Sequence, residues 1–385
     1  MTSNIPYYFD YAATTPVDKR VLDFMLPFFR DVFGNSSSIH RYGQQAEGVI
    51  ENARATMAQW LNCRSDEVIF TSGGTESDNL ALRGAAFAKQ KESGTNHILV
   101  PRTEHPAVLR TAQQLAQNDA FELEYLPVNA YGLTTVDIVA EKLRPSTALI
   151  SIMYANNEIG TINSIAEIGS LCRSKGILFH TDAVQAAAYL PVDTQKLNVD
   201  FLSLGAHKFY GPKGIGALYV RKGVPFIPQQ TGGSQEMGRR AGTSNTPYIA
   251  GLAKAFELAQ SERNLRTEHV LPLRDRLIGR ILEEIPQSQL TGHPQLRLPN
   301  HASFVFEGID GNDLLMHLDL AGFACSSGSA CKTGSPEPSE VLIEIGFDRD
   351  WALGSLRLTI GNESNAEQIE NLLEQLPNII KGLRK

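Results

Sequence analysis

One short segment combines glycine with hydroxyl side chains where a strand is expected to run into a helix. Residues 72–77 read Ser-Gly-Gly-Thr-Glu-Ser. Glycine lets the backbone approach a ligand closely, and the free N–H groups of a first helical turn attract phosphate. Gly74 and Thr75 are therefore candidate phosphate-binding residues. A capped turn without a ligand is the alternative, because Thr and Ser are also good helix N-caps.

An acidic and a basic side chain follow later strands of the same region. Asp182 ends an apolar strand at the edge where open α/β sheets bind ligands, and a buried carboxylate requires a cationic partner. On its own, Asp182 is as easily explained as a helix N-cap. Lys208 stands just past another strand and before a turn rich in Gly and Pro. It competes with Lys213, which lies within that turn and is expected to be solvated.

These three features together predict a cofactor. Pyridoxal phosphate requires an amine that anchors it, a carboxylate against its pyridine nitrogen and a cradle for its phosphate. Lys208, Asp182 and the turn at residues 74–75 provide one each, in the chain order phosphate loop, acid, lysine. The sequence therefore predicts an enzyme that holds pyridoxal phosphate as a Schiff base on Lys208, which must lose its proton to react.

A loop of small residues later in the chain carries two of the four cysteines. Such a composition cannot pack a core, so the loop is expected to be exposed. Cys331 lies in mid-loop beside Lys332, whose charge favours the reactive thiolate. Cys325 lies where an apolar run meets the loop and is expected to be structural. A disulfide between these cysteines, or a metal site, is a weaker interpretation, because no matching His/Cys pair lies nearby in sequence.

Alternating strands and helices must position these side chains. Helices are expected at residues 76–91, 107–117 and 165–175. Strands are expected at residues 68–71, 97–100, 148–153, 177–181, 201–204 and 216–220. This alternation is typical of a mainly parallel sheet with helices on both faces.

The second half of the chain has a different pattern. A long helical stretch is expected over residues 247–285, with a break near Pro272. After it the sequence predicts a strand at 303–306, helices at 312–320 and 337–345, a strand at 355–360 and a closing helix. This order indicates a smaller α+β domain.

Composition narrows the class of protein. A chain of 385 residues favours two domains, and a net charge of −7 disfavours nucleic acid as a partner. Four cysteines are too few for a disulfide framework in a chain of this length. The first ten residues lack the features of a signal peptide, and no window is apolar enough for a membrane helix. We therefore expect a cytoplasmic enzyme without a membrane or nucleic-acid partner.

Motifs along nearly the whole chain resemble one family, the cysteine desulfurases of the NifS/IscS type. They lie at residues 8–16, 70–77, 104–105, 156–160, 180–182, 207–208, 240–243 and 326–331. The resemblance implies a pyridoxal-phosphate-dependent transferase of fold type I, related to class-V aminotransferases, with a mainly parallel seven-stranded sheet and a smaller α+β domain. The corresponding boundaries are 16–258 for the large domain, and 1–15 with 259–385 for the small domain.

The resemblance also implies an activity. Such enzymes act as homodimers that convert L-cysteine to L-alanine and leave the sulfur as a persulfide, here on Cys331. An acceptor such as an iron–sulfur scaffold protein then receives the sulfur. A selenocysteine lyase or a related aminotransferase-like enzyme is the alternative. A cofactor-binding assembly subunit without activity is a third possibility.

Around the cofactor ring, the resemblance assigns roles residue by residue. Lys208 corresponds to the Schiff-base lysine and Asp182 to the partner of the pyridine nitrogen. His105 corresponds to the residue that stacks on the ring and moves protons. Asn156 and Gln185 correspond to residues that hydrogen-bond near the phenolic oxygen.

Further residues correspond to the phosphate and substrate sites. Gly74, Thr75 and His207 match the phosphate-binding residues, and Thr243 matches one that reaches over from the other subunit. Arg357 matches the arginine that binds the substrate carboxylate, for which its bidentate geometry is suited. Asn35 matches a residue at the substrate entrance.

Four positions depart from the family pattern. Gly205 replaces a serine that commonly contributes a hydroxyl to the phosphate site. Lys332 replaces the Thr or Ser that follows the catalytic cysteine, Ser36 replaces a common proline, and Asn362 replaces a frequent arginine. Gly205 therefore predicts weaker phosphate binding.

Overall fold

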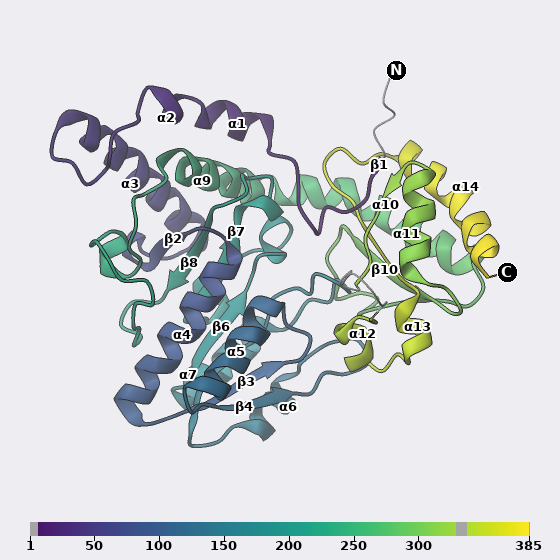
Figure 1. The fold of residues 1–385 in the computed structure, drawn as a ribbon, viewed down its shortest axis with the longest axis horizontal. Helices are drawn as coiled ribbons and strands as arrows, with labels where there is room; N and C mark the ends of the chain where they lie inside the picture. Colours follow the sequence, from purple (N-terminus) through teal and green to yellow (C-terminus); the bar gives the residue numbers. More distant parts are fainter. Residues whose placement is uncertain (1–6, 329–336, 385) are drawn as a thin grey trace.

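The computed structural model describes residues 7–328 and 337–384, which form two lobes (Figure 1). In the described part of the larger lobe, one sheet has seven strands in the order β2-β8-β7-β6-β5-β3-β4. The strands are β2 (Val68–Thr71), β3 (His97–Pro101), β4 (Glu122–Leu126), β5 (Thr147–Ser151), β6 (Leu178–Asp182), β7 (Phe201–Gly205) and β8 (Gly216–Val220). Only β8 runs antiparallel to its neighbours among these described strands, so the prediction of a mainly parallel sheet is confirmed.

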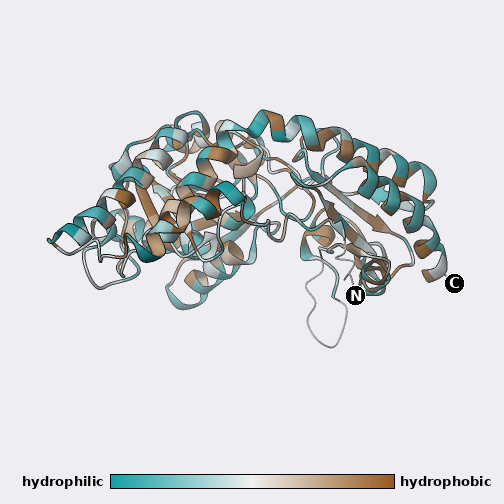
Figure 2. Ribbon diagram, turned by 90° about the horizontal axis from the view of Figure 1, so that it is seen from above, coloured by the Kyte–Doolittle hydropathy of each residue, from teal (hydrophilic) through white to brown (hydrophobic). Residues whose placement is uncertain are grey.

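Helices cover both faces of this sheet because successive strand residues point to opposite sides. In β2, Val68 and Phe70 pack into one apolar cluster, whereas Ile69 packs into another. The second cluster lies under α4 (Gly74–Ser93) and α5 (Pro106–Asn118). The first lies under α3 (Arg41–Leu61), α7 (Ile165–Lys175) and α9 (Thr246–Ser261). Figure 2 shows brown strands between helices whose outward faces are largely teal.

Two short helices, α6 (Val136–Lys142) and α8 (Thr194–Leu197), complete the connections between the strands. At the N-terminal end, α1 (Lys19–Met25) and α2 (Pro27–Arg30) form an arm that leads into α3 (Figure 1). In the described residues, no helix is long and apolar enough to cross a membrane.

The smaller lobe combines antiparallel strands with helices, as predicted. Its sheet has the order β12-β10-β9, formed by β9 (Ser288–Leu290), β10 (His301–Phe306) and β12 (Ser355–Thr359). The helices are α10 (Arg263–Glu284), α11 (Gly311–Leu320), α12 (Glu340–Glu344), α13 (Arg349–Leu353) and α14 (Ala366–Leu383).

The beginning of the described chain belongs with this smaller lobe. Strand β1 (Tyr7–Tyr8) pairs in parallel with β11 (Phe323–Ala324), and Asp10 bridges to Thr359 on β12. These pairings support the division of residues 16–258 from residues 1–15 with 259–385, which we retain as a proposal. The second boundary falls in the last turn of α9.

The helix break predicted near Pro272 is wrong. Pro272 lies inside α10, and the break falls instead at Glu262, between α9 and α10. Although an interior proline removes one backbone hydrogen bond, Val270, Leu277 and Ile281 are buried and hold α10 in place. The sequence signal of proline was therefore outweighed by tertiary packing.

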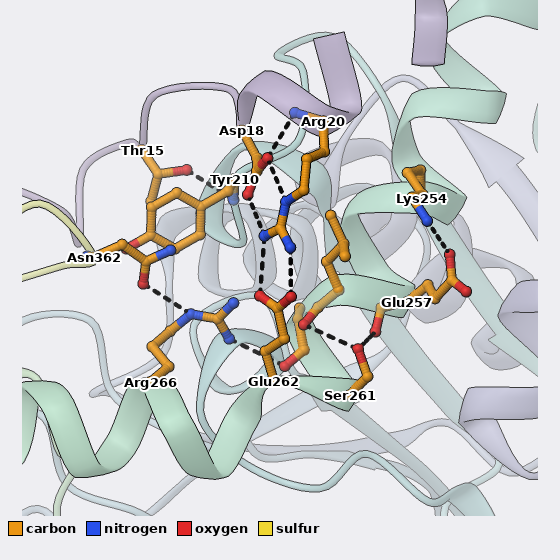
Figure 3. Close-up of polar contacts among 12 residues, drawn as sticks. Thr15, Asp18, Arg20, Tyr210, Lys254, Glu257, Ser261, Glu262, Arg266 and Asn362 are labelled. Carbon is orange, nitrogen blue, oxygen red and sulfur yellow. Dashed lines mark hydrogen bonds and ion pairs between the residues drawn. The ribbon is translucent and has the colours of Figure 1, made fainter. Parts of the chain in front are cut away.

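Polar side chains stabilise the actual break (Figure 3). Arg20 donates to Glu262 at 2.5 Å, and Arg266 donates to the carbonyl of Ala259 at 3.0 Å, which satisfies an end carbonyl of α9. The Nε of Arg266 also donates to the side chain of Asn362 at 3.1 Å. The backbone N–H of Asn362 donates to the hydroxyl of Tyr210 at 2.9 Å, so Asn362 links α10 to the larger lobe.

Candidate active site

A cavity of about 340 Å³ lies at the carboxyl ends of the parallel strands, where open α/β sheets bind ligands. The smaller lobe closes it through Arg357 on β12, and the N-terminal segment contributes Ala12 and Ala13. Most of the predicted site residues line this cavity, namely Gly74, Thr75, His105, Asp182, Gln185, His207, Lys208 and Arg357. The fold therefore gathers side chains that are distant in sequence.

Lys208 lies in a single 3-10 turn directly after β7. Its Nζ donates to the carbonyl of Ala12 at 2.5 Å and to that of Ala13 at 2.6 Å. Burial, with a smaller contribution from the charge of Arg357, lowers the pKa of Lys208 to about 8. The amine can therefore lose its proton near neutral pH, as Schiff-base formation requires. Lys213 is exposed and does not line the cavity.

Asp182 is the last residue of β6. Its Oδ1 accepts a hydrogen bond from the backbone N–H of Val184 at 2.8 Å. Burial raises the pKa of Asp182, and this effect is opposed by the nearby His105, by the bond from Val184 and by Lys208. A carboxylate in these surroundings gains from a cation on the cavity side, and a protonated pyridine nitrogen is such a cation.

His105 caps the N-terminus of α5, where Pro106 is well placed because it lacks an N–H to satisfy. Its Nδ1 accepts the N–H of Ala107 at 3.1 Å, so the neutral ring carries its proton on Nε2. Burial lowers the pKa of His105. Burial thus favours the neutral ring, and the hydrogen bond from Ala107 holds it in one orientation beside the cavity.

The start of α4 forms a cradle suited to phosphate. The helix begins at Gly74, and no side chain caps it at Gly73, so its first N–H groups remain available to an anion. A Cβ added at Gly74 would come within 2.7 Å of Val184, so this position has no room for a side chain. His207 lies across the cradle with its Nδ1 3.2 Å from the hydroxyl of Thr14, and burial lowers its pKa to about 4.

Gly205 lies directly beside this cradle. A Cβ added there would lie 3.3 Å from the backbone nitrogen of Gly74 and 3.4 Å from Val184. A serine at this position would thus place a hydroxyl next to the first turn of α4. The fit would be tight, and Gly205 itself has no group that makes such a contact.

Arg357 and Gln185 bring the N-terminal segment to the cavity wall. Arg357 donates through Nη2 to Asp10 at 2.7 Å and through Nη1 to the carbonyl of Asn157 at 3.0 Å. Its Nε is buried without a hydrogen-bond partner among the described residues. Gln185 donates to the carbonyl of Ala12 at 2.7 Å.

Three predicted site residues do not line the cavity of this chain. The amide of Asn156 is buried, accepting from the backbone of Glu158 and donating to the carbonyl of Thr103. Asn35 caps a turn in an exposed loop, and Thr243 is exposed. Their assigned roles stay predictions.

Cys331 and Lys332 lie outside the described residues. Cys325 is described, and burial raises the pKa of its thiol well above the usual range. A thiolate at Cys325 is therefore disfavoured, which suits the structural role expected from the sequence.

The structure adds residues for which the sequence gave no role. The carbonyls of Ala12 and Ala13 hold Lys208, and Asp10 pairs with Arg357. Two further buried acids, Asp78 and Glu104, lie behind Asp182. For Glu104 the available signal was its position directly before His105 in one of the motifs.

Comparison with known proteins identifies the family. The family model described as aminotransferase class-V matches residues 7–372, so the chain belongs to the class-V aminotransferase family. A cysteine desulfurase IscS of Methanosarcina thermophila is 48% identical over 383 residues, covering 100% of this chain and 94% of the relative. The chain belongs, within the class-V family, to the cysteine desulfurases.

Solved structures agree with this assignment. A NifS-like protein is 35% identical with a TM-score of 0.91, over 98% of this chain and 100% of that chain. A structure titled SspA in complex with cysteine is 36% identical with a TM-score of 0.81, over 92% of this chain and 98% of that chain. These likenesses confirm the predicted fold type.

Pyridoxal phosphate is the cofactor of this family, and the described residues fit it. The uncapped start of α4 and the crowding at Gly74 leave a backbone cradle for its phosphate. Asp182 faces the cavity as the carboxyl group for a pyridine nitrogen, and Lys208 is buried with a lowered pKa. The chain is thus a pyridoxal-phosphate-dependent enzyme.

Proposed function

We propose that this chain takes the sulfur of L-cysteine, releases L-alanine and carries the sulfur as a persulfide on Cys331. The observation that carries the proposal is the buried amine of Lys208 at the same cavity as Asp182 and Arg357. The 48% identity to a cysteine desulfurase over the whole chain supports the substrate, as does a relative solved in complex with cysteine.

When bound, pyridoxal phosphate supplies an acceptor for the electron pair released at the α-carbon. Lys208 removes the α-proton, because its pKa of about 8 makes a fraction of neutral amine available near neutral pH. Asp182 holds a proton on the pyridine nitrogen, and Arg357, which lines the cavity, binds the substrate carboxylate. His105 exchanges protons through Nε2, since Nδ1 is occupied.

The sulfur step balances without an added oxidant. The Cys331 thiolate attacks the substrate sulfur, forming an S–S bond while the C–S bond breaks. The electron pair of the broken bond remains on the substrate carbon, which takes up a proton and becomes the methyl group of alanine. A thiol acceptor then reduces the persulfide.

The direct test is a product assay on the wild-type protein loaded with pyridoxal phosphate. Incubation with L-cysteine and a thiol reductant is expected to give alanine and sulfide in equal amounts. A strong preference for selenocysteine would favour a lyase instead, and an amino group transferred to a keto acid would favour an aminotransferase. Either result would contradict the proposal.

We also propose a homodimer in which Thr243 reaches the phosphate of the other subunit. Large apolar side chains are exposed along the arm of α1, α2 and the following loop, with Phe33 67% and Ile39 92% exposed. Contiguous apolar surface of this kind is typical of protein interfaces. Thr243 is itself exposed and makes no contribution to the cavity of its own chain.

The arm gives a prediction for the dimer. Replacing both Phe33 and Ile39 by serine is expected to weaken self-association by at least about 100-fold, because each substitution removes buried apolar area worth about 1.5–3 kcal/mol. Sedimentation equilibrium measures the change. Leu320→Ser is the matched control, since Leu320 is 86% exposed on α11 of the smaller lobe. An unchanged dimer in the arm variant would rule out this interface.

Gly205 gives a second prediction. Gly205→Ser is expected to tighten binding of pyridoxal phosphate about tenfold relative to Gly205→Ala, because a hydrogen bond to a charged group contributes about 1.5–3 kcal/mol. The alanine variant is the control for crowding, since both variants bring the same Cβ to 3.3 Å from Gly74. Fluorescence titration of each apoprotein variant with pyridoxal phosphate gives the dissociation constants that are compared. Equal values for the two variants would show that no hydroxyl contact forms.

The sulfur acceptor and the location follow from the same resemblance. We propose that an acceptor protein, such as an iron–sulfur scaffold, receives the persulfide sulfur and that the enzyme acts in the cytoplasm. The net charge of −7 supports a protein rather than a nucleic acid as the partner.

A further inference from the structure

A second carboxyl group lies beside Asp182 at the cavity. Asp78 stands on α4, one turn after Thr75, and the residue is only 1% exposed. One oxygen of Asp78, one oxygen of Asp182 and a ring nitrogen of His105 all lie within 4.8 Å of one another. Two buried carboxyl groups this close cannot both be ionised at neutral pH, because each charge opposes the other.

The surroundings decide which of the two carries the charge. Asp182 accepts the N–H of Val184 and is stabilised as an anion by His105 and Lys208. Asp78 has an oxygen, Oδ1, that is buried without a hydrogen-bond partner. An unpartnered buried oxygen is far more stable on a neutral carboxylic acid than on a carboxylate. The charge therefore belongs on Asp182 and the proton on Asp78.

The histidine nearest to Asp78 does not offer a positive charge. Nε2 of His180 lies 3.6 Å from Oδ1 of Asp78. Its two nitrogens lie 2.8 Å from the hydroxyl of Ser151 and 2.9 Å from that of Ser203, which holds the ring between β5 and β7. Burial lowers the pKa of His180 to about 3, so the ring is neutral.

A third acid adds to the negative surroundings. Glu104 is buried, accepts the N–H of Met153 through Oε1 and leaves Oε2 without a partner. Burial and the charge of Asp182 raise its pKa. Burial and then the charge of Asp182 raise the pKa of Asp78, the nearby hydroxyl of Ser203 opposes this rise, and Glu104 adds a smaller increase. An ionised Asp182 therefore favours the protonated form of Asp78.

We propose that Asp78 is a positioning residue: it keeps its proton while Asp182 is ionised, and it takes over the negative charge when Asp182 is neutralised. The inference rests on the proposed function, which pairs Asp182 with the pyridine nitrogen. With Asp78 protonated, the two carboxyl groups together present one negative charge to the cofactor. Asp78 can ionise when Asp182 carries no charge.

A double-mutant cycle on cofactor affinity tests the proposal. Dissociation constants for pyridoxal phosphate are measured on the apoprotein of the wild type, Asp78→Asn, Asp182→Asn and the double variant. Asp78→Asn is expected to change affinity less than about threefold, and Asp182→Asn to weaken it at least about tenfold. Adding Asp78→Asn to Asp182→Asn is expected to weaken affinity by at least a further fivefold or so.

A role in packing alone would make Asp78→Asn equally costly in both backgrounds, and that result would overturn the proposal. Two further results distinguish a failure of the proposed role of Asp78 from a failure of the proposed function. If wild-type protein fails to bind pyridoxal phosphate, the proposed function fails and the inference with it. If the wild type binds tightly but the two substitutions act independently, only the inference fails.

A measurement on the wild type covers the case in which Asp78→Asn does not fold. The protein is prepared with aspartate labelled with ¹³C at the side-chain carboxyl and measured by infrared spectroscopy. The label shifts only the carboxyl bands of aspartate, which distinguishes them from those of glutamate. In the loaded protein, where the pyridine nitrogen keeps Asp182 ionised, a band of one protonated aspartate is expected at neutral pH. Its absence would overturn the proposal.

Discussion

Lys208→Ala is expected to lower turnover of L-cysteine by at least about 10³-fold, because it removes both the cofactor anchor and the base at the α-carbon. Among the described residues that line the cavity, Lys208 is the one lysine, so no neighbour can replace it. Borohydride reduction followed by peptide mapping is expected to find the cofactor on Lys208 in the wild type and nowhere in the variant.

Lys213→Ala is the matched control. Lys213 lies five positions further along the same turn, is exposed and does not line the cavity, so its loss is expected to leave turnover near the wild-type level. If Lys213→Ala were the inactive variant and Lys208→Ala remained active, the site would be assigned to the wrong lysine. Small primary amines should partly restore turnover to Lys208→Ala but not improve the wild type.

The lowered pKa of Lys208 adds a pH dependence to this prediction. Only the neutral amine reacts with an aldehyde, so cofactor uptake by the apoprotein is expected to rise as the pH passes through about 8. An unperturbed lysine would show the rise more than two units higher, near its ordinary pKa of about 10.4. Stopped-flow absorbance at several pH values distinguishes the two.

The strands that the sequence predicted well share one property: both of their faces are buried. Runs such as residues 148–153 and 201–204 are apolar apart from one serine each, which indicates a strand inside a parallel sheet. Strand β4 was not predicted, because Glu122–Leu126 lies at the sheet edge and alternates acidic with apolar residues. The mistaken break at Pro272 arose because burial of one face of α10 is not visible in a local pattern.

The site was predictable where parallel strand ends carry its residues, since the fold brings those ends to one edge. Asp182 and Lys208 follow from this rule. The carbonyl of Ala12 does not, because it meets Lys208 across a separation of 196 residues through backbone atoms that any residue has. Asp78 was also beyond the sequence, because its proximity to Asp182 depends on how α4 packs against the sheet.

Cys331→Ala is expected to stop formation of persulfide and sulfide, lowering turnover by at least about 10³-fold, because the variant has no nucleophile for the substrate sulfur. Cofactor content should stay at the wild-type level, since the described residues that line the cavity are unchanged. Alkylation of the protein after incubation with cysteine, followed by mass spectrometry, detects the persulfide and its position.

Cys325→Ala is the control that separates a reactive cysteine from a nearby one. Burial raises the pKa of the Cys325 thiol and disfavours its thiolate, so this variant is expected to retain both turnover and the persulfide on Cys331. Full turnover in Cys331→Ala would point to an enzyme that needs no protein thiol, such as a selenocysteine lyase. Loss of activity in both variants together with loss of cofactor would instead indicate damage to the fold. Only loss of sulfur transfer with the cofactor in place, and only in Cys331→Ala, assigns the sulfur step to Cys331.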